Sequence, residues 1–119
     1  MKRIYYLSTC DTCKKILQSI DTQGFELVDI KQNPLSEKQL DELYAMTGSY
    51  EKLFSKRTRL YKSLGLKDKN LSEADFKKYL LEDYTFLQRP VLVDGDYISV
   101  GSSPKTKKEL QEKYLLFII

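Results

Sequence analysis

Histidine and tryptophan are both absent from this chain of 119 residues, and cysteine occurs only twice. Without an imidazole, the chain cannot supply a histidine base, a Ser-His-Asp triad or a histidine ligand to zinc. A zinc site needs about four ligands, and the chain offers two thiols. The five glycines form no phosphate-binding loop. We therefore expect neither a metal centre nor a bound cofactor.

Long apolar runs and a strong net charge are missing as well. The first apolar run, Ile4 to Leu7, is too short for the core of a signal peptide, and no membrane-spanning run follows. The formal net charge of +3 is too small to argue for nucleic acid. We expect a cytoplasmic protein that neither enters a membrane nor binds DNA directly.

The two cysteines form a Cys-x-x-Cys motif, Cys10 to Cys13, between the apolar run and a helical pattern. A helix start exposes backbone N–H groups at the positive end of the helix dipole, which favours a thiolate. We therefore predict that Cys10 is the attacking thiol. Cys13, in the first turn, should be more covered and should resolve a mixed disulfide on Cys10. The backbone N–H groups of Thr12 and Cys13 could also hold an anion.

Other interpretations of the pair remain open. A structural disulfide would close a very small loop and constrain the unfolded chain little. A zinc site would lack ligands, and two buried, inert cysteines are also possible. In a reducing compartment a Cys-x-x-Cys is more often catalytic or metal-binding than structural, which favours the redox interpretation.

The order of the expected elements predicts the fold. We expect strands at 3–7, 25–30, 91–93 and 97–100, the last two joined at Asp94-Gly95. Helices are expected at 12–22 (ending at Gly24), from Ser36 to Gly48, within 55–66, from Ser72, and from Ser103-Pro104. The apolar tail Leu115–Ile119 should be buried against the sheet or a partner.

These elements predict an α/β fold: a four-stranded mixed sheet flanked by helices, with a helical insertion at about 36–86 between the second and third strands. Hydrophobic residues make up 41% and charged residues 31%, as in ordinary soluble proteins. We expect a single domain, residues 1–119.

Three stretches resemble the arsenate reductase (ArsC)/Spx family, whose fold is thioredoxin-like. The loop Tyr6 to Lys15 is similar to the active-site loop of that family, and Leu87 to Asp94, with Arg89-Pro90, to its second signature. Ser55 to Leu64 resembles its middle basic helix. The resemblance implies a thioredoxin-like domain and two possible activities.

The first activity is that of the arsenate reductases, in which a cysteine at the position of Cys10 attacks the oxyanion. Arginines hold the substrate, and glutathione with glutaredoxin completes the cycle. Three residues depart from that pattern: Tyr6 stands for a histidine, Lys14 for an arginine and Ser102 for a third arginine. Asp11, beside Cys10, opposes both a thiolate and an incoming anion.

The second activity is that of the Spx branch, where a Cys-x-x-Cys is a redox switch and the protein binds the RNA polymerase α subunit through the C-terminal domain of that subunit. The presence of Cys13 fits this branch. A basic tail beyond the last helix, expected of that branch, is missing from this sequence, so we rank the thiol-dependent oxidoreductase first.

The resemblance also implies the roles of individual residues. Cys10 is expected to be the nucleophile, Cys13 the resolving thiol, and Arg89 the cation that favours the thiolate. Substrate contacts are expected from Thr12, Lys14, Arg57, Arg89 and Pro90, with Pro90 in the cis form. The external reductant should be glutathione with glutaredoxin, or thioredoxin. On the residues alone, Arg89 could equally be a surface charge, and Lys14 and Arg57 could belong to solvated helix faces.

Overall fold

The computed structural model describes residues 1–116. Backbone contacts divide the chain into two compact units. The first contains residues 1–33 and the chain from Arg89 onward, and the second is Pro34–Gln88. The single domain over 1–119 stays a prediction, and each unit is described by itself.

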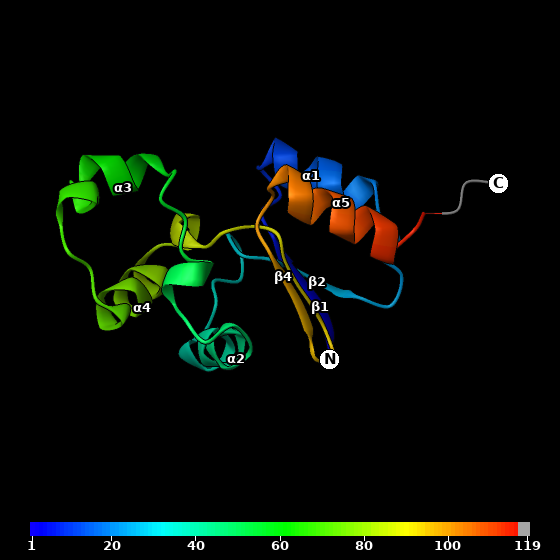
Figure 1. Ribbon diagram of the computed structural model, residues 1–119, viewed down its shortest axis with the longest axis horizontal. Helices are drawn as coiled ribbons and strands as arrows, with labels where there is room; N and C mark the ends of the chain where they lie inside the picture. Colours follow the sequence, from blue (N-terminus) through cyan, green and yellow to red (C-terminus); the bar gives the residue numbers. More distant parts are fainter. Residues whose placement is uncertain (117–119) are drawn as a thin grey trace. The chain divides into compact units, whose positions relative to one another are not determined.

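The first unit is built on one four-stranded sheet (Figure 1). Its strands are β1 (Lys2–Tyr6), β2 (Glu26–Asp29), β3 (Val91–Asp94) and β4 (Tyr97–Val100), in the order β2-β1-β3-β4. β1 runs parallel to β2 and antiparallel to β3, which pairs antiparallel with β4. The predicted mixed sheet is therefore confirmed.

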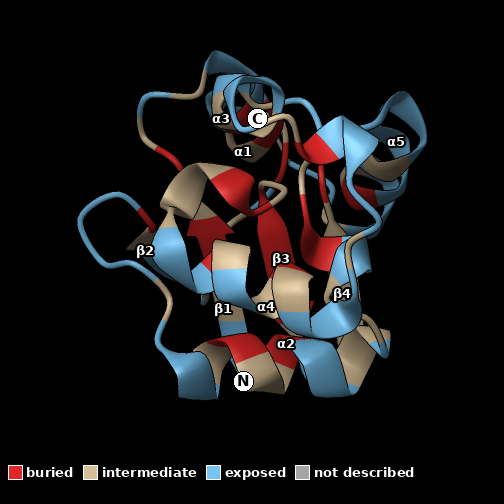
Figure 2. Cartoon of the chain, turned by 90° about the vertical axis from the view of Figure 1, so that its left-hand side faces the viewer, coloured by how far each residue is buried: buried red, intermediate tan, exposed pale blue. Residues whose placement is uncertain are grey.

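The predicted hairpin joins β3 to β4. Asp94 pairs with Tyr97, so the loop consists of two residues, Gly95 and Asp96. Gly95 has a φ of 59°, a left-handed conformation that glycine adopts without a steric cost. Val91, Leu92 and Val93 are buried, and most of β3 is red in Figure 2.

Two helices, α1 (Asp11–Gln18) and α5 (Pro104–Lys113), lie side by side over one face of the sheet (Figure 1). The core between helices and strands contains Ile4, Ile16, Ile20, Leu92 and Leu110, all buried. As predicted, Ser103 caps α5 by accepting the Thr106 N–H, and Pro104 takes the first helical position. The start of α1 follows the end of β1, at the edge of the sheet where β3 begins.

Helix α1 is shorter than the predicted 12–22. The N–H and the hydroxyl of Ser19 both donate to the carbonyl of Ile16, and this ends the helix. The N–H of Asp21 donates to the carbonyl of Tyr114 instead of continuing the helix. Gly24, the predicted helix end, lies in the next turn with a φ of 86°.

The second unit is helical. It contains α2 (Glu37–Thr47), α3 (Arg59–Ser63) and α4 (Glu73–Glu82), with short 3₁₀ turns at Glu51–Leu53, Leu66–Asp68 and Tyr84–Phe86. The predicted insertion between β2 and β3 is confirmed. Its buried apolar side chains are Leu40, Leu43, Leu53, Phe54, Leu66, Phe76, Leu80, Phe86 and Leu87.

The helix starts of this unit follow the predicted caps. Ser36 and Gln39 form the expected capping box, and Gly48 ends α2 in the left-handed conformation. Ser72 begins α4, where its partner in a second capping box is Asp75.

The basic helix within 55–66 begins later than predicted. Phe54 pairs with Leu87 in an isolated β-bridge, and the Ser55 N–H donates to the carbonyl of Phe86. These bonds keep the backbone extended, so α3 starts at Arg59 after the Thr58 cap. Arg57 therefore precedes the helix.

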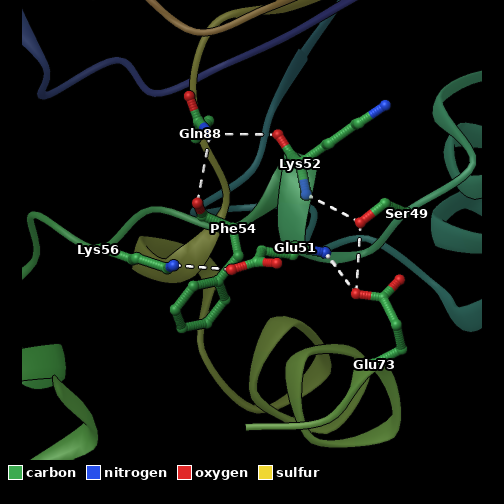
Figure 3. A network of polar contacts seen from close by, with 7 residues as sticks. All are labelled: Ser49, Glu51, Lys52, Phe54, Lys56, Glu73 and Gln88. Carbon is green, nitrogen blue, oxygen red and sulfur yellow. Dashed lines mark hydrogen bonds and ion pairs between the residues drawn. The ribbon is translucent and has the colours of Figure 1, made fainter. Parts of the chain in front are cut away.

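A polar network holds the loop between α2 and the β-bridge (Figure 3). The Glu73 carboxylate accepts the N–H groups of Tyr50 at 2.7 Å and Glu51 at 3.2 Å. The Gln88 amide donates to the carbonyl of Phe54 at 3.2 Å. Glu73 thus caps the backbone of a neighbouring loop from the first turn of α4.

The first two residues of the apolar tail are not buried against the sheet, and their burial against a partner stays a prediction. Leu115 and Leu116 are 59% and 46% exposed. Residues 117–119, the rest of that prediction, lie outside the described residues. Among residues 1–116, no helix is long and apolar enough to span a membrane.

Candidate functional site

Cys10 lies at the start of α1, where the sequence predicts it. It is the residue that precedes the helix, with an extended backbone. Its N–H donates to the carbonyl of Leu7 at 3.0 Å, and its carbonyl accepts the Lys14 N–H at 3.1 Å. The Cys10 side chain makes no capping hydrogen bond and is partly exposed. Its sulfur is therefore held at the positive end of a helix and can be reached from solvent.

Cys13 lies in the first turn of α1 and is fully buried. Burial raises the pKa of the Cys13 thiol to about 11, against the opposing effects of a hydrogen bond from the Leu7 backbone and the charge of Arg89. The thiol is therefore protonated at neutral pH. The neighbouring Cys10 also raises the pKa of Cys13, and both cysteines are free thiols.

Arg89 and Pro90 come to the same site from the segment before β3. The positive charge of Arg89 favours the Cys13 thiolate, so the guanidinium acts on the cysteine pair electrostatically. The peptide bond between Arg89 and Pro90 is cis, as the family resemblance implies. Pro90 is buried, and its carbonyl accepts the Gly101 N–H at 3.0 Å.

The remaining predicted contact residues fall into two groups. Thr12 and Lys14 are exposed on α1, in the same unit as the cysteines. Arg57 is exposed in the other unit. Its part in substrate binding stays a prediction.

One feature of the site was missed from the sequence. The Ser8 hydroxyl, two residues before Cys10, donates to Asp29 Oδ2 at 2.7 Å. This bond is the main cause that lowers the pKa of the Asp29 carboxyl. A signal for it exists, because Ser8 follows the first strand and Asp29 ends the second. The carboxyl ends of parallel neighbouring strands meet at one edge of a sheet.

The site has no set of side chains suited to a metal. Within residues 1–116, no three cysteine, aspartate or glutamate side chains gather closely enough to bind an ion. What the arrangement offers is an accessible thiol, a covered thiol in the adjacent helical turn and a nearby guanidinium. Thiol chemistry is the chemistry that such a set can perform.

Sheet, helices and site together define a thioredoxin-like protein with a paired-cysteine loop at the start of its first helix. The chain belongs to the ArsC family, whose model matches residues 5–110.

Relatives of the chain carry different names. It is 30% identical over 102 residues to the uncharacterized protein YusI of Bacillus subtilis, covering 82% of this chain and 86% of YusI. It is 27% identical over 111 residues to the arsenate reductase of Haemophilus influenzae, covering 90% and 96% of the two chains. It is 24% identical over 101 residues to the global transcriptional regulator Spx of Lactiplantibacillus plantarum, covering 82% and 76%.

Solved structures share the fold. SACOL0876 from Staphylococcus aureus superimposes with a TM-score of 0.72 at 32% identity, covering 92% of this chain and 98% of the other. The arsenate reductase from Vibrio cholerae superimposes with a TM-score of 0.74 at 23% identity, covering 92% and 96%. The thioredoxin-like fold is thus confirmed.

Proposed function

We propose that this chain is a thiol–disulfide oxidoreductase in which Cys10 attacks and Cys13 resolves. The observation that carries the proposal is the pairing of two unlike thiols. Cys10 is accessible at a helix start, and the buried Cys13 thiol lies in the first turn of the same helix, near enough for Cys10 to raise its pKa.

The reaction proceeds in two steps. The Cys10 thiolate attacks one sulfur of a substrate disulfide; that S–S bond breaks, a mixed disulfide forms on Cys10, and the first product leaves as a thiol after taking up a proton. Cys13 then loses its proton to the departing sulfur and attacks Cys10. The second product leaves as a thiol, and the two cysteines, now joined as the Cys10–Cys13 disulfide, have given two electrons to the substrate.

An external thiol must return these two electrons. Glutathione with glutaredoxin, or thioredoxin, supplies them by attacking the Cys10–Cys13 disulfide. Cys10 is the sulfur that such a reductant can reach, because Cys13 is fully buried. No bound cofactor takes part in this cycle.

Substrates of two classes suit the site. A protein or glutathione disulfide needs only the thiol pair. A small oxyanion would lie against the Thr12 and Cys13 N–H groups at the start of α1, with Arg89, Pro90 and Lys14 as its contacts. A contact from Arg57 is implied by the family resemblance alone. The arsenate reductase name of the H. influenzae relative supports the second class. The exposed Asp11 beside Cys10 opposes it.

Turnover separates these classes. NADPH consumption coupled through glutathione reductase and glutaredoxin is measured with a small neutral disulfide and with arsenate. We expect turnover of the disulfide, and its loss in Cys10→Ser. Turnover of arsenate alone would replace the disulfide class, and no turnover of either substrate would remove the enzyme assignment.

A second candidate function is a redox-sensing regulator that binds the C-terminal domain of the α subunit of RNA polymerase. Two observations favour it: the cysteine pair and the likeness to the regulator Spx. A pull-down with that domain, using oxidised and reduced protein, tests it. Binding that changes with the redox state supports the regulator, and no binding in either state removes it.

A further inference from the structure

We propose that Ser8 and Asp29 are positioning residues for the cysteine pair. The inference rests on the proposed thiol–disulfide function and adds two residues that neither touch nor react with the substrate. Their role is to hold the loop that carries Cys10 in the arrangement that lets Cys13 attack.

The anchor of the loop is a fixed carboxylate. Asp29 ends β2 and accepts two hydrogen bonds, from the Ser8 hydroxyl at 2.7 Å and from the Lys31 N–H at 3.1 Å. The backbone that follows Asp29 is bonded to β1, since the Ile30 N–H donates to the carbonyl of Tyr6 at 2.9 Å. Ser8 is therefore tied to the edge of the sheet and not to another mobile side chain.

The loop connects this anchor to both sulfurs. Leu7 to Cys10 forms a turn closed by the Cys10 N–H and the Leu7 carbonyl at 3.0 Å. The Leu7 backbone also lowers the pKa of the Cys13 thiol, so it lies close to that sulfur. Ser8 lies inside this turn, between the residue that contacts Cys13 and the residue that carries the nucleophile.

Loss of the bond between Ser8 and Asp29 should therefore slow the resolving step by Cys13 more than the first attack by Cys10. The resolving step needs the sulfurs of Cys10 and Cys13 at attacking distance, and the turn from Leu7 to Cys10 that Ser8 ties to Asp29 sets the position of Cys10. When this turn is released from Asp29, the position of Cys10 relative to Cys13 is less well fixed, and the Leu7 backbone favours the Cys13 thiolate less. The first attack by Cys10 on an accessible substrate depends neither on the distance between the two sulfurs nor on the ionisation of Cys13.

A two-phase thiol assay tests the inference. Reduced protein is mixed in a stopped-flow cell with an aromatic disulfide that releases one coloured thiolate on attack by Cys10 and a second when Cys13 resolves the adduct. In Ser8→Ala we expect the second phase to slow by about fivefold, the order of effect of one lost hydrogen bond. The first phase should stay within about twofold of wild type.

Matched variants separate positioning from general stability. Ser8→Thr keeps the hydroxyl and should restore the second phase, whereas Asp29→Asn, with a weaker acceptor, should slow it. Ser19→Ala is the control, because it also removes one serine hydrogen bond, to the Ile16 carbonyl at the far end of α1. It should leave both phases unchanged.

The outcomes are distinct. A second phase within twofold of wild type in both Ser8→Ala and Asp29→Asn overturns the inference, and so does equal slowing in Ser19→Ala. If Ser8→Ala does not fold, Asp29→Asn and Ser8→Thr decide. A wild-type protein without any second phase contradicts the proposed function itself, a result that differs from all of these.

Discussion

Cys13 lies in the turn of α1 that directly follows Cys10, yet only Cys10 is accessible to solvent. One turn of helix therefore separates two thiols of the same chemical type into different environments. Burial keeps Cys13 protonated at neutral pH, whereas the start of α1 leaves Cys10 open to attack on a partner. This difference leads to the predictions that follow.

Alkylation should distinguish the two thiols. In reduced protein we expect iodoacetamide to modify Cys10 at least about tenfold faster than Cys13, because a buried, protonated thiol is both shielded and unreactive. Mass spectrometry of peptides after short exposures measures both rates. Equal rates in folded protein would contradict the assignment, and protein unfolded in urea is the control in which the two rates should converge.

Stability should fall in alkaline solution because of Cys13. Its pKa in the folded protein is about 11, above its ordinary value. The unfolded chain therefore loses this proton first, and the contribution of Cys13 to stability is complete below the ordinary thiol pKa and lost as pH rises toward 11. We expect a loss of roughly 1–2 kcal/mol from this group.

Urea unfolding at neutral and alkaline pH measures that loss. Other groups titrate in the same range, so the relevant quantity is the difference between wild type and Cys13→Ser, whose hydroxyl does not ionise. A free energy of unfolding that falls equally in both proteins would show that Cys13 is not the cause.

Glu73 should stabilise the loop that it caps. Its carboxylate accepts backbone N–H groups from Tyr50 and Glu51, so Glu73→Ala leaves both donors without this acceptor. We expect a loss of about 1 kcal/mol in the free energy of unfolding. Glu112→Ala, at an exposed position on α5, is the control and should change little. Equal effects of the two substitutions would exclude a capping role.

Gly48 should be required for its backbone conformation and not for space. It ends α2 with a φ of 76°, and no atom lies within 4 Å of the position that a Cβ would occupy. Gly48→Ala should therefore cost about 1 kcal/mol through the backbone alone, and Gly48→Asn less, because asparagine tolerates this conformation better. Thermal unfolding compares the two variants; the opposite order would contradict this explanation.

Much of the fold could be predicted because its signals are local. Ser36, Ser72 and Ser103 begin helices through bonds to residues three positions ahead, and these pairs are visible in the sequence. Asp94-Gly95 likewise fixes the hairpin over four residues. The spacing of the cysteines places both on one helical turn for the same reason.

The errors arose where distant residues decide. Helix α1 ends at the bonds of Ser19 to Ile16, and the next residues do not continue it because Asp21 bonds to the distant Tyr114. The basic helix begins late because Phe54 pairs with Leu87. Contacts between residues so far apart in the sequence cannot be predicted from a local sequence pattern. The bond between Ser8 and Asp29 was also missed, although the parallel pairing of β1 and β2 would have brought the two residues together.

Trapping with glutathione disulfide tests the central claim most directly. Reduced wild type, Cys10→Ser and Cys13→Ser are incubated with it, and intact mass is recorded. We expect wild type to end as an internal disulfide, Cys13→Ser to hold one glutathione on Cys10, and Cys10→Ser to stay unmodified. A stable adduct on Cys13 in Cys10→Ser, or none on Cys10 in Cys13→Ser, would contradict the account.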